Sequence, residues 1–256
     1  MPTINRDGVD IYYTTRGDGP ALLLTHGYSA TSAMWEGQLE AFSDRFTVIA
    51  WDMRGHGSSG SPRDDAAYSE ALTVEDMAAI LDHLGFEEAV IGGLSLGGYM
   101  SLAFHAMFPQ RVRALLIIDC GPGYRKDEPR QAWNEMALQR AADIEARGLA
   151  ALGDGSAERT TAVHTDPMGL VYAARHMLTQ EDARVLESLP DIKVPALVVA
   201  GAEDAPFLAA TDYMAAKIQD AEKLIVANAG HAVNIDQPDA FNAGVRKFLD
   251  ARRLAE

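Results

Sequence analysis

Short, nearly continuous apolar runs recur along the first half of the chain, and each predicts a buried strand. The clearest is Ala21-Leu22-Leu23-Leu24-Thr25, and the others cover residues 46–51, 89–91 and 112–118. The segments between them are spaced like amphipathic helices, near Ser32–Phe42 and from Thr73, as its cap, to about Leu84. We place Glu75 and Asp76 in the first turn of the second helix, where carboxylates suit the helix dipole. This alternation predicts a mostly parallel sheet with helices on both faces.

Two further regions extend the predicted sheet. Near the N-terminus, Thr3–Asn5 and Val9–Thr15 flank the turn Arg6-Asp7-Gly8, a pattern typical of a β-hairpin. In the last quarter of the chain the alternation resumes, with strands predicted at 194–200 and 223–227 and helices at 207–218 and 239–254.

The alternation stops between residues 121 and 190, which contain no convincing buried strand. Helical patterns near Arg130–Arg147 and Met168–Leu178 occupy this stretch instead. We therefore predict an α/β core formed by residues 1–120 and 191–256, with residues 121–190 inserted as a helical lid over the active face. The alternative is a second small domain with a separate task. The lid is favoured because the insertion begins beside the strand that precedes Ser95.

Ser95 stands in the pattern Gly93-x-Ser95-x-Gly97, between an apolar strand and a run of good helix formers. A serine at such a sharp strand-to-helix turn is held in a strained conformation with its hydroxyl exposed. The small residues on either side let the strand and the helix approach closely. The five-residue pattern alone is weak, but in this context it predicts that Ser95 is a nucleophile.

A serine nucleophile needs a base and a group that orients the base. Among seven histidines, His231 follows a predicted strand and precedes the last helix, so it lies on the sheet edge where ligands gather. Asp204 ends the preceding strand segment, which gives the chain order Ser95, Asp204, His231 expected for this triad. Asp119 is an alternative acid at the end of the strand after that of Ser95, and the chain order favours Asp204 over it. Glu203 is the near neighbour that could be mistaken for the acid.

The tetrahedral intermediate of acyl transfer needs two backbone N–H donors. One is expected from Leu96, directly after the nucleophile. The other is expected from Tyr28, in the loop His26-Gly27-Tyr28 that follows the third strand, with His26 bracing that loop.

Composition limits the function classes. The formal net charge of -15, with no basic cluster, argues against nucleic acid and against anionic membrane surfaces. The single cysteine, Cys120, excludes an internal disulfide, and no Cys/His spacing suggests a zinc site. The first residues lack the apolar core of a signal peptide, and no apolar run reaches the length of a membrane span. We therefore expect a soluble, cytoplasmic protein.

Taken together, these motifs resemble the α/β-hydrolase superfamily over nearly the whole chain. The order and spacing of that family are found in His26-Gly27, Asp52-x-x-Gly55-x-Gly57-x-Ser59, Gly93–Gly98, Gly201-x-x-Asp204 and Gly230-His231. The resemblance implies the α/β-hydrolase fold, an eight-stranded, mostly parallel sheet with an inserted lid. It also implies hydrolysis through an acyl-enzyme on Ser95, with His231 as base and then acid, and with no metal or organic cofactor.

The resemblance is weakly specific for substrate. Short length and a Gly-Leu-Ser-x-Gly-Gly elbow are similar to those of small carboxylesterases and 3-oxoadipate enol-lactonases. We expect hydrolysis of carboxylic esters of small to medium apolar compounds, with enol-lactone hydrolysis or carbon–carbon bond hydrolysis in aromatic degradation as alternatives. The enol-lactone alternative requires cationic groups, for which Arg125, Lys126 and Arg130 at the start of the lid are candidates. Haloalkane dehalogenases and epoxide hydrolases carry an aspartate where Ser95 stands, which argues against both, and a perhydrolase side activity stays open.

The non-catalytic alternative is a small-ligand receptor on the same fold, which the complete triad disfavours because inactive relatives often lose a triad member. Trp133 in the lid and Phe207 after Asp204 are candidates for lining an apolar pocket, with ordinary core packing as the alternative for each. The expected partner is a small-molecule ester or lactone. The sequence leaves the oligomeric state open, a homodimer included.

Overall fold

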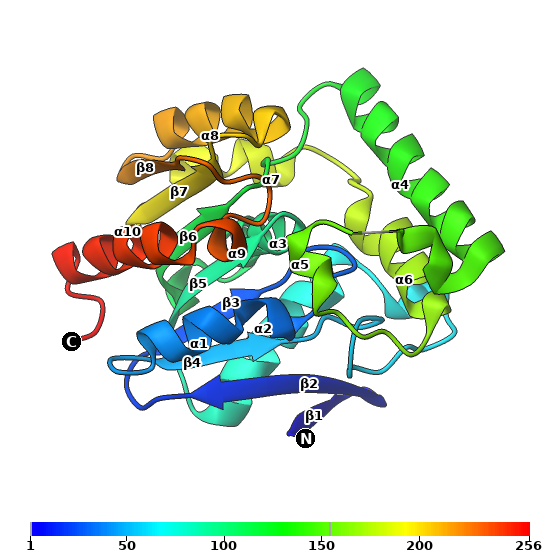
Figure 1. Ribbon diagram of the computed structural model, residues 1–256, viewed down its shortest axis with the longest axis horizontal. Coiled ribbons are helices and arrows are strands. Elements are labelled where there is room, and N and C mark those ends of the chain that lie inside the picture. The colour runs from blue at the N-terminus through cyan, green and yellow to red at the C-terminus, as the bar shows by residue number, and fades with distance from the viewer. Residues whose placement is uncertain (1, 154) are drawn as a thin grey trace.

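The computed structural model describes residues 2–153 and 155–256, which form an eight-stranded sheet flanked by helices (Figure 1). The strands are β1 (Thr3–Arg6), β2 (Val9–Arg16), β3 (Ala21–Thr25), β4 (Thr47–Trp51), β5 (Ala89–Leu94), β6 (Val112–Ile118), β7 (Ala196–Gly201) and β8 (Ala221–Val226). Their order across the sheet is β1-β2-β4-β3-β5-β6-β7-β8. Strand β2 runs antiparallel to β1 and β4, and all other neighbours are parallel. The predicted mostly parallel sheet is confirmed.

From β3 onward the helices alternate with the strands, and several helices follow one another between β6 and β7. The α-helices are α1 (Glu36–Phe42), α2 (Glu70–Leu84), α3 (Leu96–Met107), α4 (Asp127–Arg147), α5 (Ala157–Thr160), α6 (Pro167–Ala173), α7 (Arg184–Glu187), α8 (Ala205–Lys217), α9 (Val233–Asp236) and α10 (Pro238–Ala251). Helix α6 continues into a π-helical turn over Ala174–Leu178, and short 3-10 turns cover Ser32–Trp35, Asp65–Ala67, Pro109–Arg111, Gly148–Leu152 and Leu189–Asp191.

Each face of the sheet carries its own buried cluster. On β3, Leu22 and Leu24 belong to one cluster and Leu23 to the other, because successive side chains of a strand point to opposite faces. Helices α1 and α10 cover the first face, for example through Phe42 and Phe248. Helices α2, α3 and α8 cover the second face. Since β3, β5, β6 and β7 have helices on both sides, they are nearly continuous apolar runs, as predicted.

Helix α2 begins earlier than the sequence pattern predicted. Its N-cap is Ser69, whose hydroxyl accepts a hydrogen bond from Leu72 N at 3.0 Å, so Thr73 is not the cap. Asp76 is correspondingly not in the first turn. It is fully buried and forms two hydrogen bonds with Arg54, 2.6 and 2.7 Å long. The prediction failed because apolar spacing marks the buried face of a helix, whereas none of the residues of α2 before Thr73 is buried.

The chain between β6 and β7 is helical, and within its described residues it contains no strand. Helix α4 is the longest helix of the chain, and it packs on α6 and on the following π-helical turn. Figure 1 shows α4 and α6 at the right of the view and α5 nearer its middle. Helices α5 and α7 of the same segment contact the core, α5 at α9 and α7 at α3.

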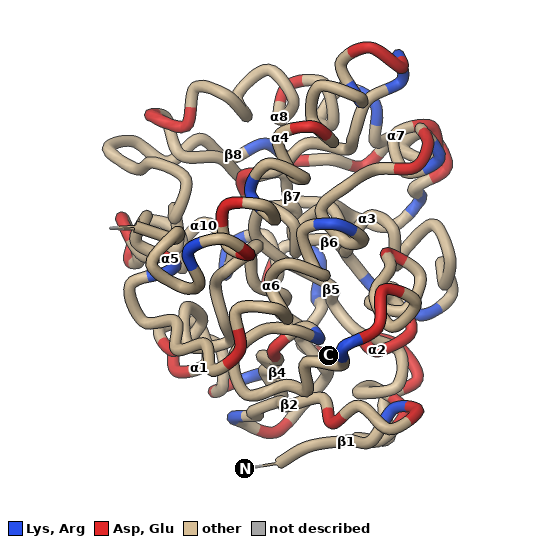
Figure 2. The backbone as a smooth tube through the Cα atoms, turned by 90° about the vertical axis from the view of Figure 1, so that its right-hand side faces the viewer, with Lys and Arg blue, Asp and Glu red and all other residues tan. Residues whose placement is uncertain are grey.

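Charged residues are dispersed over the molecule. Figure 2 shows Lys and Arg interspersed among Asp and Glu along the backbone, without a continuous basic stretch in that view. Among the described residues, no helix is both long and apolar enough to cross a membrane.

Candidate active site

Ser95 lies at the turn between β5 and α3. Its backbone has φ 57° and ψ -118°, a conformation that residues with a side chain rarely adopt. The turn is held on both sides, because Ser95 N donates to Ile118 O at 2.9 Å and Tyr99 N donates to Ser95 O at 3.1 Å. The strained turn and the partly exposed side chain together match the nucleophile position that the sequence predicted.

Glycine is required at this turn because strand and helix touch. A Cβ atom on Gly93 would lie 2.4 Å from the carbonyl of Gly97, and one on Gly97 would lie 2.1 Å from Thr25 O. These are backbone atoms that cannot move aside. The small residues of the motif therefore place α3 directly against β3 and β5, with the first turn of the helix behind Ser95.

His231 and Asp204 meet although 27 residues separate them in the chain. The imidazole Nδ1 lies 2.7 Å from Asp204 Oδ2, which orients the ring and fixes Nδ1 as the protonated nitrogen when the ring is neutral. The Phe207 ring stacks on the imidazole with 5.2 Å between centroids. The loop before His231 is fixed by Gly230 N, which donates to Asp236 Oδ2 at 2.8 Å.

The alternative acids are placed differently. Glu203 is exposed, whereas Asp204 is buried. Asp119 Oδ1 accepts a hydrogen bond from Gly201 N at 2.8 Å and does not pair with His231. Of the three carboxylates considered from the sequence, Asp204 is the one that bonds the imidazole.

The loop His26-Gly27-Tyr28 lies against the nucleophile. A Cβ atom on Gly27 would lie 3.4 Å from Ser95 Cβ. Across the described chain, neither Tyr28 N nor Leu96 N donates a hydrogen bond to another protein group, so both remain available for an oxyanion.

Buried His26 braces this loop, as the sequence suggested. Its Nδ1 lies 2.7 Å from Gly27 O, and Met53 N donates to its Nε2 at 3.0 Å. Because Nε2 accepts a hydrogen bond, the ring must be neutral, and burial lowers the pKa of His26 to about 4.

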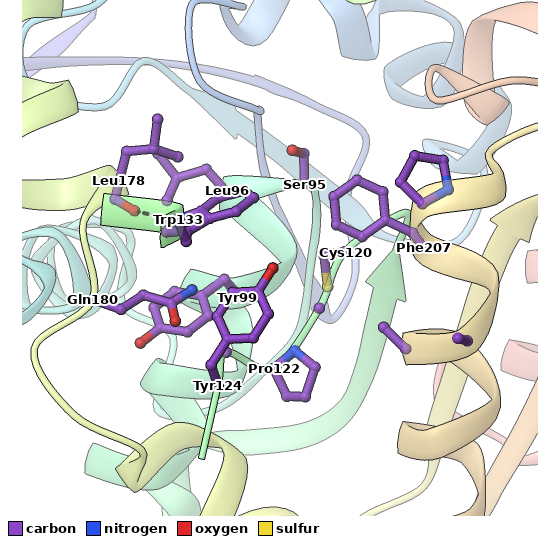
Figure 3. A pocket seen from close by; sticks show the side chains of 15 residues that line it. Ser95, Leu96, Tyr99, Cys120, Pro122, Tyr124, Trp133, Leu178, Gln180 and Phe207 are labelled. Atoms are coloured by element: carbon purple, nitrogen blue, oxygen red, sulfur yellow. Dashed lines mark hydrogen bonds between the residues drawn. The ribbon is translucent and has the colours of Figure 1, made fainter. Parts of the chain in front are cut away.

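Two cavities meet at Ser95. The first has a volume of about 280 Å³ and is mostly apolar, and Figure 3 shows Ser95 at its top with Leu96, Trp133 and Phe207 around it. Tyr99, Tyr124 and Gln180 close its other end. Trp133 and Phe207, predicted from the sequence, thus both line this cavity. Trp133 is fixed there by its indole N–H, which donates to Leu178 O at 2.8 Å.

The second cavity, of about 360 Å³, is more polar. Its lining includes all three residues of the predicted triad together with Tyr28. The Tyr28 hydroxyl donates to Leu170 O at 2.9 Å, which connects the predicted oxyanion loop to α6. Because His231 and Asp204 line the second cavity but not the first, the two cavities differ in chemistry.

The charged lining of the second cavity was missed by the sequence analysis. Arg140, Glu158 and Arg159 face this space, whereas neither cavity at Ser95 is lined by Arg125, Lys126 or Arg130. The proposed cationic candidates are therefore wrong, and Arg130 instead bonds Asp127 and Tyr124 O. The sequence did contain a signal for Arg140. Positions 133, 136 and 140 share one face of α4, so a helix that turns Trp133 toward the site also turns Arg140 toward it. Arg159 and Glu158 lie in a four-residue helix that has no readable period.

Cys120 is the one thiol of the chain, and it lines the first cavity. Complete burial and the neighbouring Asp119 raise the pKa of this thiol far above neutrality, so it stays protonated and does not compete with Ser95. In the part of the chain that the structure describes, no group of three or more His, Cys, Asp or Glu side chains is placed to hold a metal ion.

The chain is similar to known hydrolases over nearly its full length. A family model described as "Alpha/beta hydrolase family" matches residues 22–243. The chain is 30% identical to 3-oxoadipate enol-lactonase 2 of Acinetobacter baylyi over 266 residues, covering 96% of each protein. It is 29% identical to the putative carbamate hydrolase RutD of Azorhizobium caulinodans, covering 94% of this chain and 96% of the relative.

Solved structures agree with the sequence relatives. A thermophilic esterase from Thermogutta terrifontis superposes with a TM-score of 0.81 at 26% identity, covering 98% of this chain and 97% of the esterase. The names of these three proteins give different substrates, an enol-lactone, a carbamate and an ester, so the comparisons agree on hydrolysis and leave the substrate open.

Proposed function

This chain belongs to the α/β hydrolase family, and from that premise we propose that it is a serine hydrolase cleaving carboxylic esters of small to medium apolar substrates. The observation that carries the proposal is the 2.7 Å pair between His231 Nδ1 and Asp204 Oδ2, in a cavity that Ser95 also lines. A base oriented in this way beside a strained serine is the arrangement that activates a hydroxyl nucleophile.

In the proposed mechanism, Ser95 Oγ attacks the ester carbonyl while His231 Nε2 accepts the hydroxyl proton. Asp204 keeps Nδ1–H toward itself and stabilises the imidazolium that forms. The N–H groups of Tyr28 and Leu96 bind the oxyanion. His231 then gives the proton to the leaving alcohol, and an activated water releases the acyl group from Ser95 by the same steps.

The two cavities suggest how the substrate lies. His231 must protonate the leaving alcohol, so this group belongs in the second cavity, which His231 lines. The acyl group then belongs in the apolar first cavity, between Trp133 and Phe207. A pocket of this size and character fits short and medium acyl chains.

Residues 121–190 act in this proposal as a lid over the core formed by residues 1–120 and 191–256. The segment supplies Tyr124, Trp133, Leu178 and Gln180 to the first cavity. Covering Ser95 with these side chains excludes water from the developing charge and strengthens the hydrogen bonds to the oxyanion.

Enol-lactone hydrolysis is the second candidate function, and one observation favours it. Two guanidinium groups, Arg140 and Arg159, line the cavity of the triad. Burial raises the pKa of Tyr28, and the positive charges of the two arginines partly offset this rise. Glu158 in the same wall offsets one positive charge, which leaves one to attract a carboxylate-bearing substrate.

The primary test is hydrolysis of p-nitrophenyl esters from acetate to decanoate by the wild type and by Ser95→Ala. We expect turnover of about 1 s⁻¹ or faster in the wild type and its loss in the variant. The value of kcat/KM should rise about fourfold per methylene until the first cavity is full, since each buried CH₂ contributes about 0.8 kcal/mol.

Ser101→Ala is the matched control. Ser101 lies in α3, the helix that follows Ser95, and its hydroxyl donates a hydrogen bond to Gly97 O. A fluorophosphonate should label the wild type and Ser101→Ala at Ser95 and leave Ser95→Ala unlabelled. Absence of turnover on every ester and lactone, with ligand binding retained, would instead favour the receptor alternative.

A further inference from the structure

The carboxyl group of Asp119 is buried beside the triad, and the proposed mechanism does not use it. Asp119 follows β6, between the strands that carry Ser95 and Asp204, and its backbone is in the left-handed region with φ 42°. The residue is 0% exposed. Gly201 N donates to Oδ1 at 2.8 Å, whereas Oδ2 is buried and accepts no hydrogen bond.

Burying an ionised carboxylate costs free energy, and more so when one of its oxygens accepts no hydrogen bond. The neutral acid is therefore the more stable form of Asp119 in this environment. Burial is the main cause that raises the pKa of Asp119, to about 8, and the negative charge of Asp204 and a hydrogen bond with it add to the rise. The N–H groups of Gly201 and Val233 oppose it. The adjacent Cys120 thiol is neutral, and His231 reaches Asp119 only through Asp204.

The protonated acid has one O–H group to place. Oδ1 already accepts from Gly201, so the proton belongs on Oδ2, and Asp204 is the neighbouring carboxylate that can accept it. Asp204 itself is only 7% exposed and uses Oδ2 for His231, so its Oδ1 is the oxygen free to accept this hydrogen bond.

We propose that Asp119 is a positioning residue whose protonated carboxyl donates a hydrogen bond to Asp204 and holds that carboxylate in the orientation that binds His231. The inference rests on the proposed function, because it assigns Asp119 a role through the triad. A hydrogen bond from a neutral acid to a carboxylate is short and strong, and it fixes the carboxylate plane without competing for the imidazole. In other buried pairs of adjacent carboxylates, the two groups also share one proton, because two negative charges so close together repel each other.

The role predicts a dependence on pH. When Asp119 ionises, Asp204 loses its donor and gains a like charge next to it. Without that donor Asp204 is held less firmly in the orientation that binds His231, so the imidazole is aligned less well to accept the Ser95 proton. The value of kcat/KM should therefore fall above pH of about 8.

Asp119→Asn and Asp119→Ala separate this role from simple packing. The Asn amide can accept from Gly201 and donate to Asp204 at every pH, so Asp119→Asn should keep kcat within about threefold at pH 7 and lose the fall above pH 8. Asp119→Ala removes the donor and should lower kcat on the order of tenfold, the effect of one hydrogen bond, with a smaller change in KM. Identical alkaline limbs in the wild type and Asp119→Asn would overturn the proposal.

Infrared spectroscopy tests the protonation without using activity. In Ser95→Ala the C=O band of a protonated carboxylic acid should be present at pH 7, titrate near pH 8 and vanish on adding Asp119→Asn. Asp212→Asn, an exposed aspartate on α8 paired with Lys223, should leave the band unchanged. A missing band overturns the inference even if Ser95 is essential. Full activity of Ser95→Ala overturns the proposed function and does not affect the band.

Discussion

His231 Nδ1 lies 2.7 Å from Asp204 Oδ2, and the Phe207 ring covers the imidazole. Two loops at the carboxyl ends of neighbouring strands β7 and β8 make this contact. The carboxylate fixes which imidazole nitrogen carries the proton, so Nε2 of the neutral ring is left unprotonated, and Ser95 and His231 line the same cavity.

Asp204→Asn should therefore lower kcat by roughly 10⁴, because an amide at this position stabilises the wrong tautomer of His231. Steady-state kinetics on the best p-nitrophenyl ester measures the loss. Glu203→Gln is the control, since Glu203 is adjacent in the chain but exposed. An equal loss in both variants would mean that kcat depends on the negative charge of this loop and not on the bond between Asp204 and His231.

The turn at Ser95 predicts a sharp contrast between two glycines. A Cβ on Gly97 would lie 2.1 Å from Thr25 O, whereas one on Gly37 in α1 meets no atom within 4 Å. Gly97→Ala should lower the free energy of unfolding by at least about 3 kcal/mol, because a backbone oxygen blocks the new methyl group. Gly37→Ala should raise it by about 0.5–1 kcal/mol through helix propensity. Urea unfolding checks both, and a tolerated Gly97→Ala would contradict the close packing of α3 on β3.

The buried histidines predict acid sensitivity. The rings of His26, His56 and His164 form a contiguous cluster, and burial lowers the pKa of each. The unfolded chain then binds more protons than the native state below pH of about 6.5, so stability is lost as the pH falls from there toward about 4.

His56→Gln isolates one member of this cluster. Its unfolding free energy should decline less steeply with acid than that of the wild type, by up to about 1.4 kcal/mol per pH unit. Chemical unfolding at several pH values between 4 and 7 measures the slopes. His83→Gln, the same change at an exposed histidine in the last turn of α2, is the control for the substitution itself. A slope for His56→Gln parallel to that of the wild type would show that His56 binds a proton as readily in the native state as in the unfolded chain and would contradict the prediction.

The arginines of the second cavity predict selectivity for anionic substrates. We compare an aryl ester with its para-carboxylate analogue, whose leaving group carries the charge into this cavity. Changing Arg140 and Arg159 together to Met should lower kcat/KM for the anionic ester about 10- to 100-fold, the effect of one or two charge-assisted hydrogen bonds. The neutral ester should change less than about threefold.

Arg130→Met is the control for this experiment, because Arg130 pairs with Asp127 outside both cavities. Equal losses on the neutral and the anionic ester would mean that Arg140 and Arg159 support the lid and do not recognise substrate charge. Selectivity that also weakens at high salt would support the direct ionic contact.

Local patterns in the sequence were enough to predict much of this architecture. The strands Ala21–Thr25 and Val112–Ile118 have the bounds that the apolar runs predicted, because a strand buried on both faces has few polar positions. The turn Arg6-Asp7-Gly8 is also as expected, since Asp7 and Gly8 have positive φ. The ends of helices were predicted less accurately where they consist of polar residues. The N-cap of α2, for example, is Ser69 and not Thr73.

The sequence by itself determined the alternation of strands and helices and the order of Ser95, Asp204 and His231, because these depend on neighbours within a few residues. Only the tertiary structure decided that His231 bonds Asp204 while Asp119 stays buried next to it, and that Arg140 and Arg159, not Arg130, face the cavity. These contacts depend on how strands align in the sheet and how the lid helices pack on it. Such distances join residues far apart in the chain, and no local period encodes them.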